Sequence, residues 1–218
     1  MVIILALVTV LSVILVNEVL LKRRYVTHLA SDDKAGTIKL PKKIDYPEEL
    51  HFTRSHTWAS ISKALVTIGL DDFTQRLAGR IDRIEAIQPG EMVKKGQPVW
   101  VIHFGDKSVA QKAPISGRVA AVNVNVLRDP SLINQAPYSE GWILKLAPLS
   151  LIAETSELLN PGDFRKWNDQ IRNKLLESVL PELGAVYGDA SELRQGAGRI
   201  IEPEKWARLV EVLFNEND

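Results

Sequence analysis

The first 21 residues constrain this chain more than any other segment, because they are apolar almost without interruption. Only Thr9, Ser12, Asn17 and Glu18 break a run of aliphatic side chains, and Glu18 carries its single ionisable group. At a helical rise of 1.5 Å per residue, such a run spans about 30 Å, which is the thickness of the hydrocarbon core of a bilayer. Residues 1–21 are therefore predicted to form one transmembrane helix that anchors the chain in lipid.

The charges beside this helix predict its orientation. Lys22, Arg23 and Arg24 follow the apolar run directly, and the positive-inside rule places such a cluster in the cytoplasm. A cleavable signal peptide is the alternative, but no basic region precedes the run and no small-x-small cleavage site follows it. We expect a single-pass protein of the bacterial inner membrane with its C-terminal part in the cytoplasm.

Two interpretations of the polar pair near the end of this helix stay open. Asn17 and Glu18 lie within one turn of the basic cluster. They could reach the lipid headgroups, or they could face the helix of another subunit, since polar groups in lipid seek partners.

Composition excludes several classes of function. The 27 basic and 27 acidic side chains cancel, so nucleic acid is not expected as a partner. The chain has no cysteine, and its histidines at positions 28, 51, 56 and 103 lack the spacing of a metal site. It also has no Ser/His/Asp set and no glycine-rich phosphate loop. We expect no catalytic residue, no metal and no cofactor, and thus a protein that is not an enzyme.

The chain after the anchor divides into three parts. Residues 22–50 combine many charges with glycine and proline and show no sustained period, which predicts a tether. Residues 51–150 have short β-rich runs, at 64–70, 98–104, 117–126 and 142–146, and one helix is predicted at 71–77. Turn signals such as Gly105-Asp106 separate these runs. This part is predicted to be the β-rich core domain.

Residues 151–218 are predicted to be a helical extension. Apolar side chains recur at steps of three and four residues from 163 to 180 and again from 203 to 214, which indicates two amphipathic helices. Their apolar faces include Trp167, Ile171, Trp206 and Leu213. We expect these four side chains to be buried against the core domain or against a partner.

Four stretches of the core domain resemble the glycine cleavage H protein. They are Ser55-His56-Thr57-Trp58, residues 66–73 (VTIGLDDF), residues 113–117 (APISG) and residues 133–142 (INQAPYSEGW), in the order of that family. The resemblance implies a mainly β fold, the barrel-sandwich or hammerhead domain of lipoyl and biotinyl carriers. Considered alone, the motif residues have structural explanations, and His56 is interpreted as a strand residue with satisfied hydrogen bonds.

The resemblance also identifies where carrier chemistry would take place. The family carries a lipoyl group on the lysine of an ESVKA motif at a hairpin tip. If Gly96 to Ala113 matches the family without insertion, His103 stands at the glutamate and Asp106 at the lysine. Lys107 is one residue further on, where a side chain of a hairpin points to the opposite face. We interpret Lys107 as an ordinary lysine, with a lipoyl site there as the alternative.

These features predict a protein that keeps a carrier fold without its carrier lysine. The first hypothesis is a non-enzymatic accessory subunit that packs against other subunits of a bacterial membrane complex, such as a respiratory electron-transfer complex. The second is a membrane-tethered lipoyl carrier that is modified on Lys107.

Overall fold

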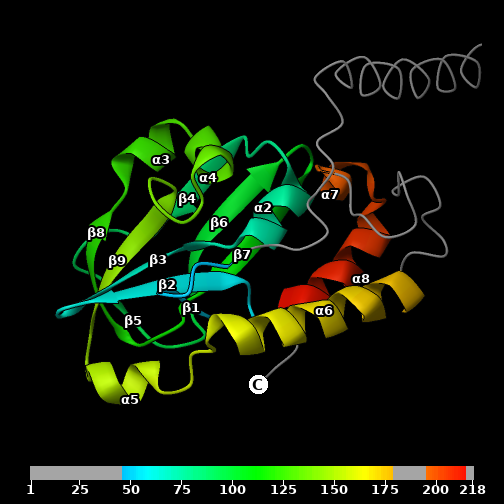
Figure 1. Ribbon diagram of the computed structural model, residues 1–218. Coiled ribbons are helices and arrows are strands. Elements are labelled where there is room, and N and C mark those ends of the chain that lie inside the picture. Colours follow the sequence, from blue (N-terminus) through cyan, green and yellow to red (C-terminus); the bar gives the residue numbers. More distant parts are fainter. Residues whose placement is uncertain (1–45, 179–194, 215–218) are drawn as a thin grey trace, which may run out of the picture. The chain divides into compact units, whose positions relative to one another are not determined.

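The computed structural model describes residues 46–178 and 195–214 (Figure 1). The predicted transmembrane segment, residues 1–21, and most of the predicted tether lie outside these residues. Within the described part of the chain, no helix is long and apolar enough to cross a membrane.

Antiparallel pairing builds a six-stranded sheet with the order β1-β2-β3-β9-β8-β5. Its strands are β1 (His51–Phe52), β2 (Thr57–Ser62), β3 (Leu65–Leu70), β5 (Met92–Val93), β8 (Gly117–Val122) and β9 (Trp142–Pro148). A second sheet of three strands has the order β4-β6-β7, with β4 (Arg83–Ala86), β6 (Pro98–Phe104) and β7 (Lys107–Lys112). The predicted mainly β core is therefore confirmed.

Short helices connect the strands. They are α2 (Asp72–Ala78), α3 (Val124–Arg128) and α4 (Ser131–Gln135). The side chain of Asp71 accepts a hydrogen bond from the backbone N–H of Thr74, which caps α2. The prediction of a strand up to residue 126 was wrong, because Asn123 accepts hydrogen bonds from the N–H groups of Asn125 and Val126 and begins α3 there.

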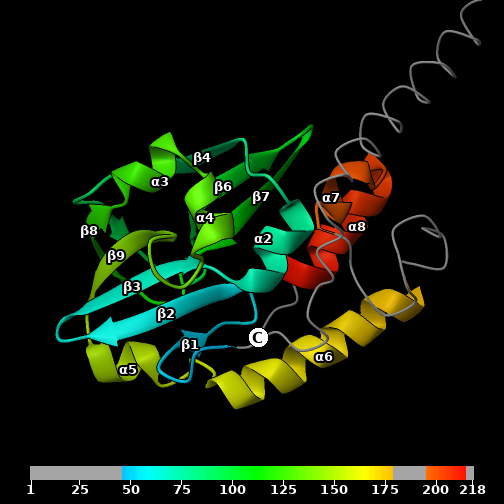
Figure 2. The same ribbon diagram turned by 45° about the horizontal axis from the view of Figure 1, so that its top comes forward.

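The C-terminal part contributes α5 (Leu151–Thr155), α6 (Pro161–Ser178), α7 (Ala197–Ile200) and α8 (Pro203–Phe214). Figures 1 and 2 show α8 lying between α6 and the sheet that contains β6 and β7. The prediction that Ile171, Trp206 and Leu213 are buried is confirmed, and the half-buried Trp167 packs on the same core. These helices cover the barrel of their own chain.

The folded domain also includes residues from the predicted tether. Tyr46 and Leu50 are buried in one cluster with Phe52 and Phe164. The Phe52 and Phe164 rings stack with centroids 4.6 Å apart, and Asn168 of α6 donates a hydrogen bond to the Tyr46 hydroxyl at 2.8 Å. Burial raises the pKa of Tyr46 far above its usual range, so this hydroxyl stays neutral. Helix α6 is thereby fixed to the start of the domain.

Candidate functional site

The hairpin between β6 and β7 has a two-residue turn at the predicted position. Phe104 pairs with Lys107, so Gly105 and Asp106 form the turn. Gly105 has a φ of +61°, as the first central residue of a type II′ hairpin turn requires. The exposed fraction of the Asp106 side chain is 68%. The outermost side chain of this hairpin is therefore a solvated carboxylate.

The neighbouring lysine is buried beside the turn. Only 5% of the Lys107 side chain is exposed. Its Nζ donates a hydrogen bond to Oδ1 of Asp106 at 2.8 Å and another to the carbonyl of Arg199 at 3.4 Å. The hydrogen bond from Lys107 lowers the pKa of Asp106, which stays ionised near neutral pH. Strand β7 begins with this buried lysine, and buried and exposed side chains alternate along the strand from there.

Arg199 of α7 fixes the C-terminal segment to the hairpin. Its guanidinium donates hydrogen bonds to Oδ2 of Asp82, at 2.7 Å, and to the backbone carbonyl of Arg80. The same carboxylate oxygen accepts the N–H of Gly105 at 2.7 Å. Burial alone would raise the pKa of Asp82. The hydrogen bonds from Gly105 and Arg199 have the larger effect, so its pKa lies below the usual value. A single ionised carboxylate therefore binds both the hairpin turn and α7.

The backbone just before α7 also packs closely against the end of α2. The N–H of Gly196 donates to the carbonyl of Arg76 at 2.7 Å, at the end of α2. A Cβ atom built on Gly79 would lie 2.6 Å from the Cα of Gly196. Both glycines have positive φ values, +67° and +77°. Any larger residue at Gly79 would therefore push α7 away from α2.

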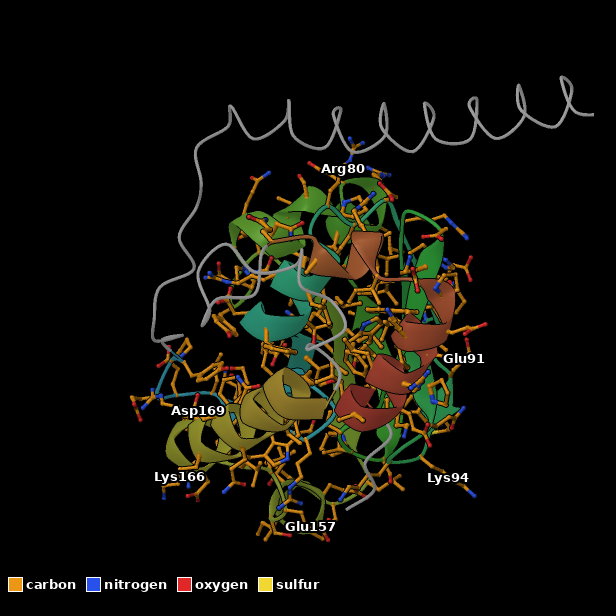
Figure 3. All side chains as sticks on the ribbon, turned by 90° about the vertical axis from the view of Figure 1, so that its right-hand side faces the viewer. Arg80, Glu91, Lys94, Glu157, Lys166 and Asp169 are labelled. Atoms are coloured by element: carbon orange, nitrogen blue, oxygen red, sulfur yellow. The ribbon has the colours of Figure 1, made fainter. Side chains whose placement is uncertain are left out.

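Helix α8 then covers the apolar side of the hairpin. Trp206 packs edge-on against Phe104 with ring centroids 5.3 Å apart. Leu209, Leu213 and Phe214 are buried in the same core. Figure 3 looks onto this face, with α7 and α8 in front of the strands. The surroundings of Lys107 are therefore closed by the chain's own C-terminal helices.

His56 forms a separate buried pair. It lies in a bend before β2 with φ +61°, so the prediction of a strand position was wrong. Its carbonyl accepts the N–H of Asp71, and its Nδ1 lies 2.7 Å from Oδ2 of Asp71. Its Nε2 has no hydrogen-bond partner among the described residues, and the Phe73 ring stacks on the imidazole. The pair joins β2 to the cap of α2.

The other histidines that the structure describes, His51 and His103, belong to no metal site. His103 of β6 lies opposite Arg83 of β4, and burial together with the Arg83 charge lowers its pKa. In residues 46–178 and 195–214, no group of three His, Asp or Glu side chains is arranged to hold a metal ion. Asp106 and Lys107 are brought together with Arg199 and Asp82. The sequence did not single out Arg199 or Asp82, because a pairing of residues 117 positions apart has no local pattern.

The comparisons with known proteins agree with this architecture. The family model described as "Glycine cleavage H-protein" matches residues 50–171. The chain is 35% identical over 120 residues to the glycine cleavage system H protein of Carboxydothermus hydrogenoformans, covering 55% of this chain and 92% of that protein. It is 32% identical over 123 residues to the H protein of Thermus thermophilus, covering 56% and 95%.

A solved structure shares the fold. The glycine cleavage system H protein of Mycobacterium marinum superimposes with a TM-score of 0.52 at 23% identity, covering 57% of this chain and 99% of that one. The family match spans more than half of the sequence and extends through the barrel into α6. The chain belongs to the glycine cleavage H-protein family.

Proposed function

We propose that this chain is a non-enzymatic accessory subunit, anchored in the bacterial inner membrane, in which the H-protein domain binds other subunits and carries no lipoyl arm. The observation that carries the proposal is the β6–β7 hairpin. Its exposed turn residue is Asp106, and the only lysine beside the turn, Lys107, is enclosed by α7.

The residues at this hairpin do not fit a lipoyl group. Lipoylation forms an amide from a primary amine, and the Asp106 carboxylate cannot form it. Lys107 has the amine, but Nζ is bonded to Asp106 and to the carbonyl of Arg199. A ligase would have to displace α7 to reach it. The alternative of a carrier modified on Lys107 therefore requires an opening of the C-terminal cover.

The segments outside the family match support a role within an assembly. The apolar residues 1–21 supply a membrane anchor, and α8 extends beyond the match. Helices α7 and α8 cover the β6–β7 hairpin. A carrier must present this hairpin to several enzymes, so a covered hairpin favours a structural subunit. A respiratory or other electron-transfer complex is the assembly we propose.

The first prediction concerns topology. Because Lys22, Arg23 and Arg24 follow the apolar run, reporters fused after Asp218 should be active in the cytoplasm and inactive in the periplasm. Replacing the three basic residues by glutamine should lower the share of chains whose C-terminal part stays in the cytoplasm. Periplasmic activity of the unaltered fusion, or a mature protein that starts after Leu21, would contradict the anchor.

The second prediction tests the subunit role. Protein purified from mildly solubilised membranes of its native host should carry stoichiometric partner subunits and have the mass of the unmodified chain. Lys107→Arg, which keeps the charge, should assemble like the wild type. Recovery as a clean monomer would refute the accessory role. A lipoyl adduct on Lys107, lost together with function in Lys107→Arg, would establish the carrier instead.

A further inference from the structure

A cavity of about 750 Å³ opens at the end of the domain away from the hairpin tip. Its walls come from residues 53–55, 95–96, 112–114 and 157–159, together with Phe214 at the end of α8. In Figure 3 the labelled Glu157, which lines the cavity, lies at the lower end of the molecule, and Lys94 lies at its lower right. A volume of this size holds a few side chains.

The cavity combines an apolar wall with basic side chains. Leu158, Leu159 and Phe214 supply apolar surface, and Phe214 is buried in the core. Arg54, Lys95 and Lys112 also line it, and Glu157 is the one acidic side chain among the described residues of its walls. The lining is therefore complementary to a ligand that carries carboxylates beside apolar groups.

The two lysines of the cavity, Lys95 and Lys112, differ in their present partners. The ammonium of Lys95 is paired with the exposed carboxylate of Glu157, whose pKa is lowered by that hydrogen bond. Lys112 is half-buried and has no ion-pair partner in the part of the chain that the structure describes. Glu157 therefore occupies the position beside Lys95 at which the carboxylate of a ligand would bind. Lys112 can bind a second carboxylate without losing an existing ion pair.

We propose that this cavity binds an acidic segment of a partner protein, with carboxylates on Lys112 and Lys95 and an apolar side chain against Leu158, Leu159 and Phe214. The proposal rests on the accessory role proposed above and names the surface and the chemistry of the contact. Carboxylates displace Glu157 from Lys95 by exchanging one exposed ion pair for another.

Peptide binding tests the cavity directly. The full chain in phosphatidylcholine nanodiscs is titrated into a short fluorescent peptide of alternating glutamate and leucine, and into the matching lysine–leucine peptide. We expect the acidic peptide alone to bind, more weakly at high salt. Lys112→Gln should weaken it about 5-fold, the effect of one exposed or half-buried ion pair. Glu157→Gln should strengthen binding, because Lys95 is released.

The control is Arg128→Gln, an exposed position on α3 with the same loss of charge, which should leave the affinity unchanged. Equal binding of both peptides, or an affinity that Lys112→Gln does not alter, would overturn the proposal. Tighter peptide binding in a Glu216→Gln, Asp218→Asn chain would also overturn it, since the chain's own acidic end would then be the occupant. The accessory role is judged separately by copurification and mass.

Discussion

Asp106→Lys is expected to turn a chain that a lipoyl ligase ignores into one that it modifies. The turn residue is largely exposed, so a lysine there presents its amine to solvent, whereas Lys107 stays enclosed. Incubation with lipoate, ATP and a ligase that acts on H proteins should change the modified fraction from undetectable to most of the chains. Intact mass spectrometry measures that fraction, and peptide mapping locates the adduct.

Ser108→Lys is the matched control. Ser108 lies two residues further along β7 on its exposed face, so the variant adds an equally accessible amine away from the turn. It should remain unmodified. If the wild-type chain is modified at Lys107, the hairpin is a working carrier site and the proposed function is wrong. If Asp106→Lys stays unmodified, Asp106 does not occupy the position of the lysine that a ligase modifies in H proteins.

Local patterns were enough to predict the elements near the hairpin. The strand from Pro98 to Phe104 and the helix from Pro203 to Phe214 have the predicted bounds. Each has a clear apolar period and a turn signal or proline at an end. The turn at Gly105-Asp106 was predictable for the same reason, since glycine tolerates the positive φ that a tight hairpin needs.

The cover over Lys107 could not be predicted in this way. Gly196 lies in the connection between the two predicted amphipathic helices, and its N–H donates a hydrogen bond to the carbonyl of Arg76 on α2. Arg199 donates a hydrogen bond to Asp82, which lies 117 positions earlier in the sequence. Such contacts depend on where the barrel places α2 and the hairpin, and no local period encodes that placement. The apolar face of α8 predicted burial but left open whether the barrel or a partner supplies the surface.

The start of the domain was also not predictable from local patterns. Tyr46 and Leu50 belong to a charged, proline-containing stretch, so composition assigned them to the tether. In the structure they pack with Phe164 of α6, a residue from the other end of the matched segment. Burial of an isolated apolar residue depends on this remote partner and not on its neighbours in sequence.

Trp206→Ala should release the C-terminal cover and make Lys107 reactive. The side chain is 7% exposed and fills the space against Phe104, so its loss should destabilise the fold by about 3–5 kcal/mol, as large-to-small core changes do. Because Trp206 joins α8 to Phe104 at the hairpin, its loss should loosen the cover at that point, while Leu209, Leu213 and Phe214 keep the rest of α8 in the core. Labelling of Lys107 by an amine reagent, followed by mass spectrometry, should then become much faster.

Arg208→Ala provides the comparison within the same helix. Arg208 is exposed on α8, so this change should alter stability by no more than about 0.5 kcal/mol and leave the labelling of Lys107 slow. Denaturant unfolding of both variants measures the stability difference. If Trp206→Ala lowers stability while Lys107 labels as slowly as in the wild type, the enclosure of the amine does not depend on α8. Rapid labelling of the unaltered chain would show that the cover opens by itself, and Lys107 would then be accessible to a ligase.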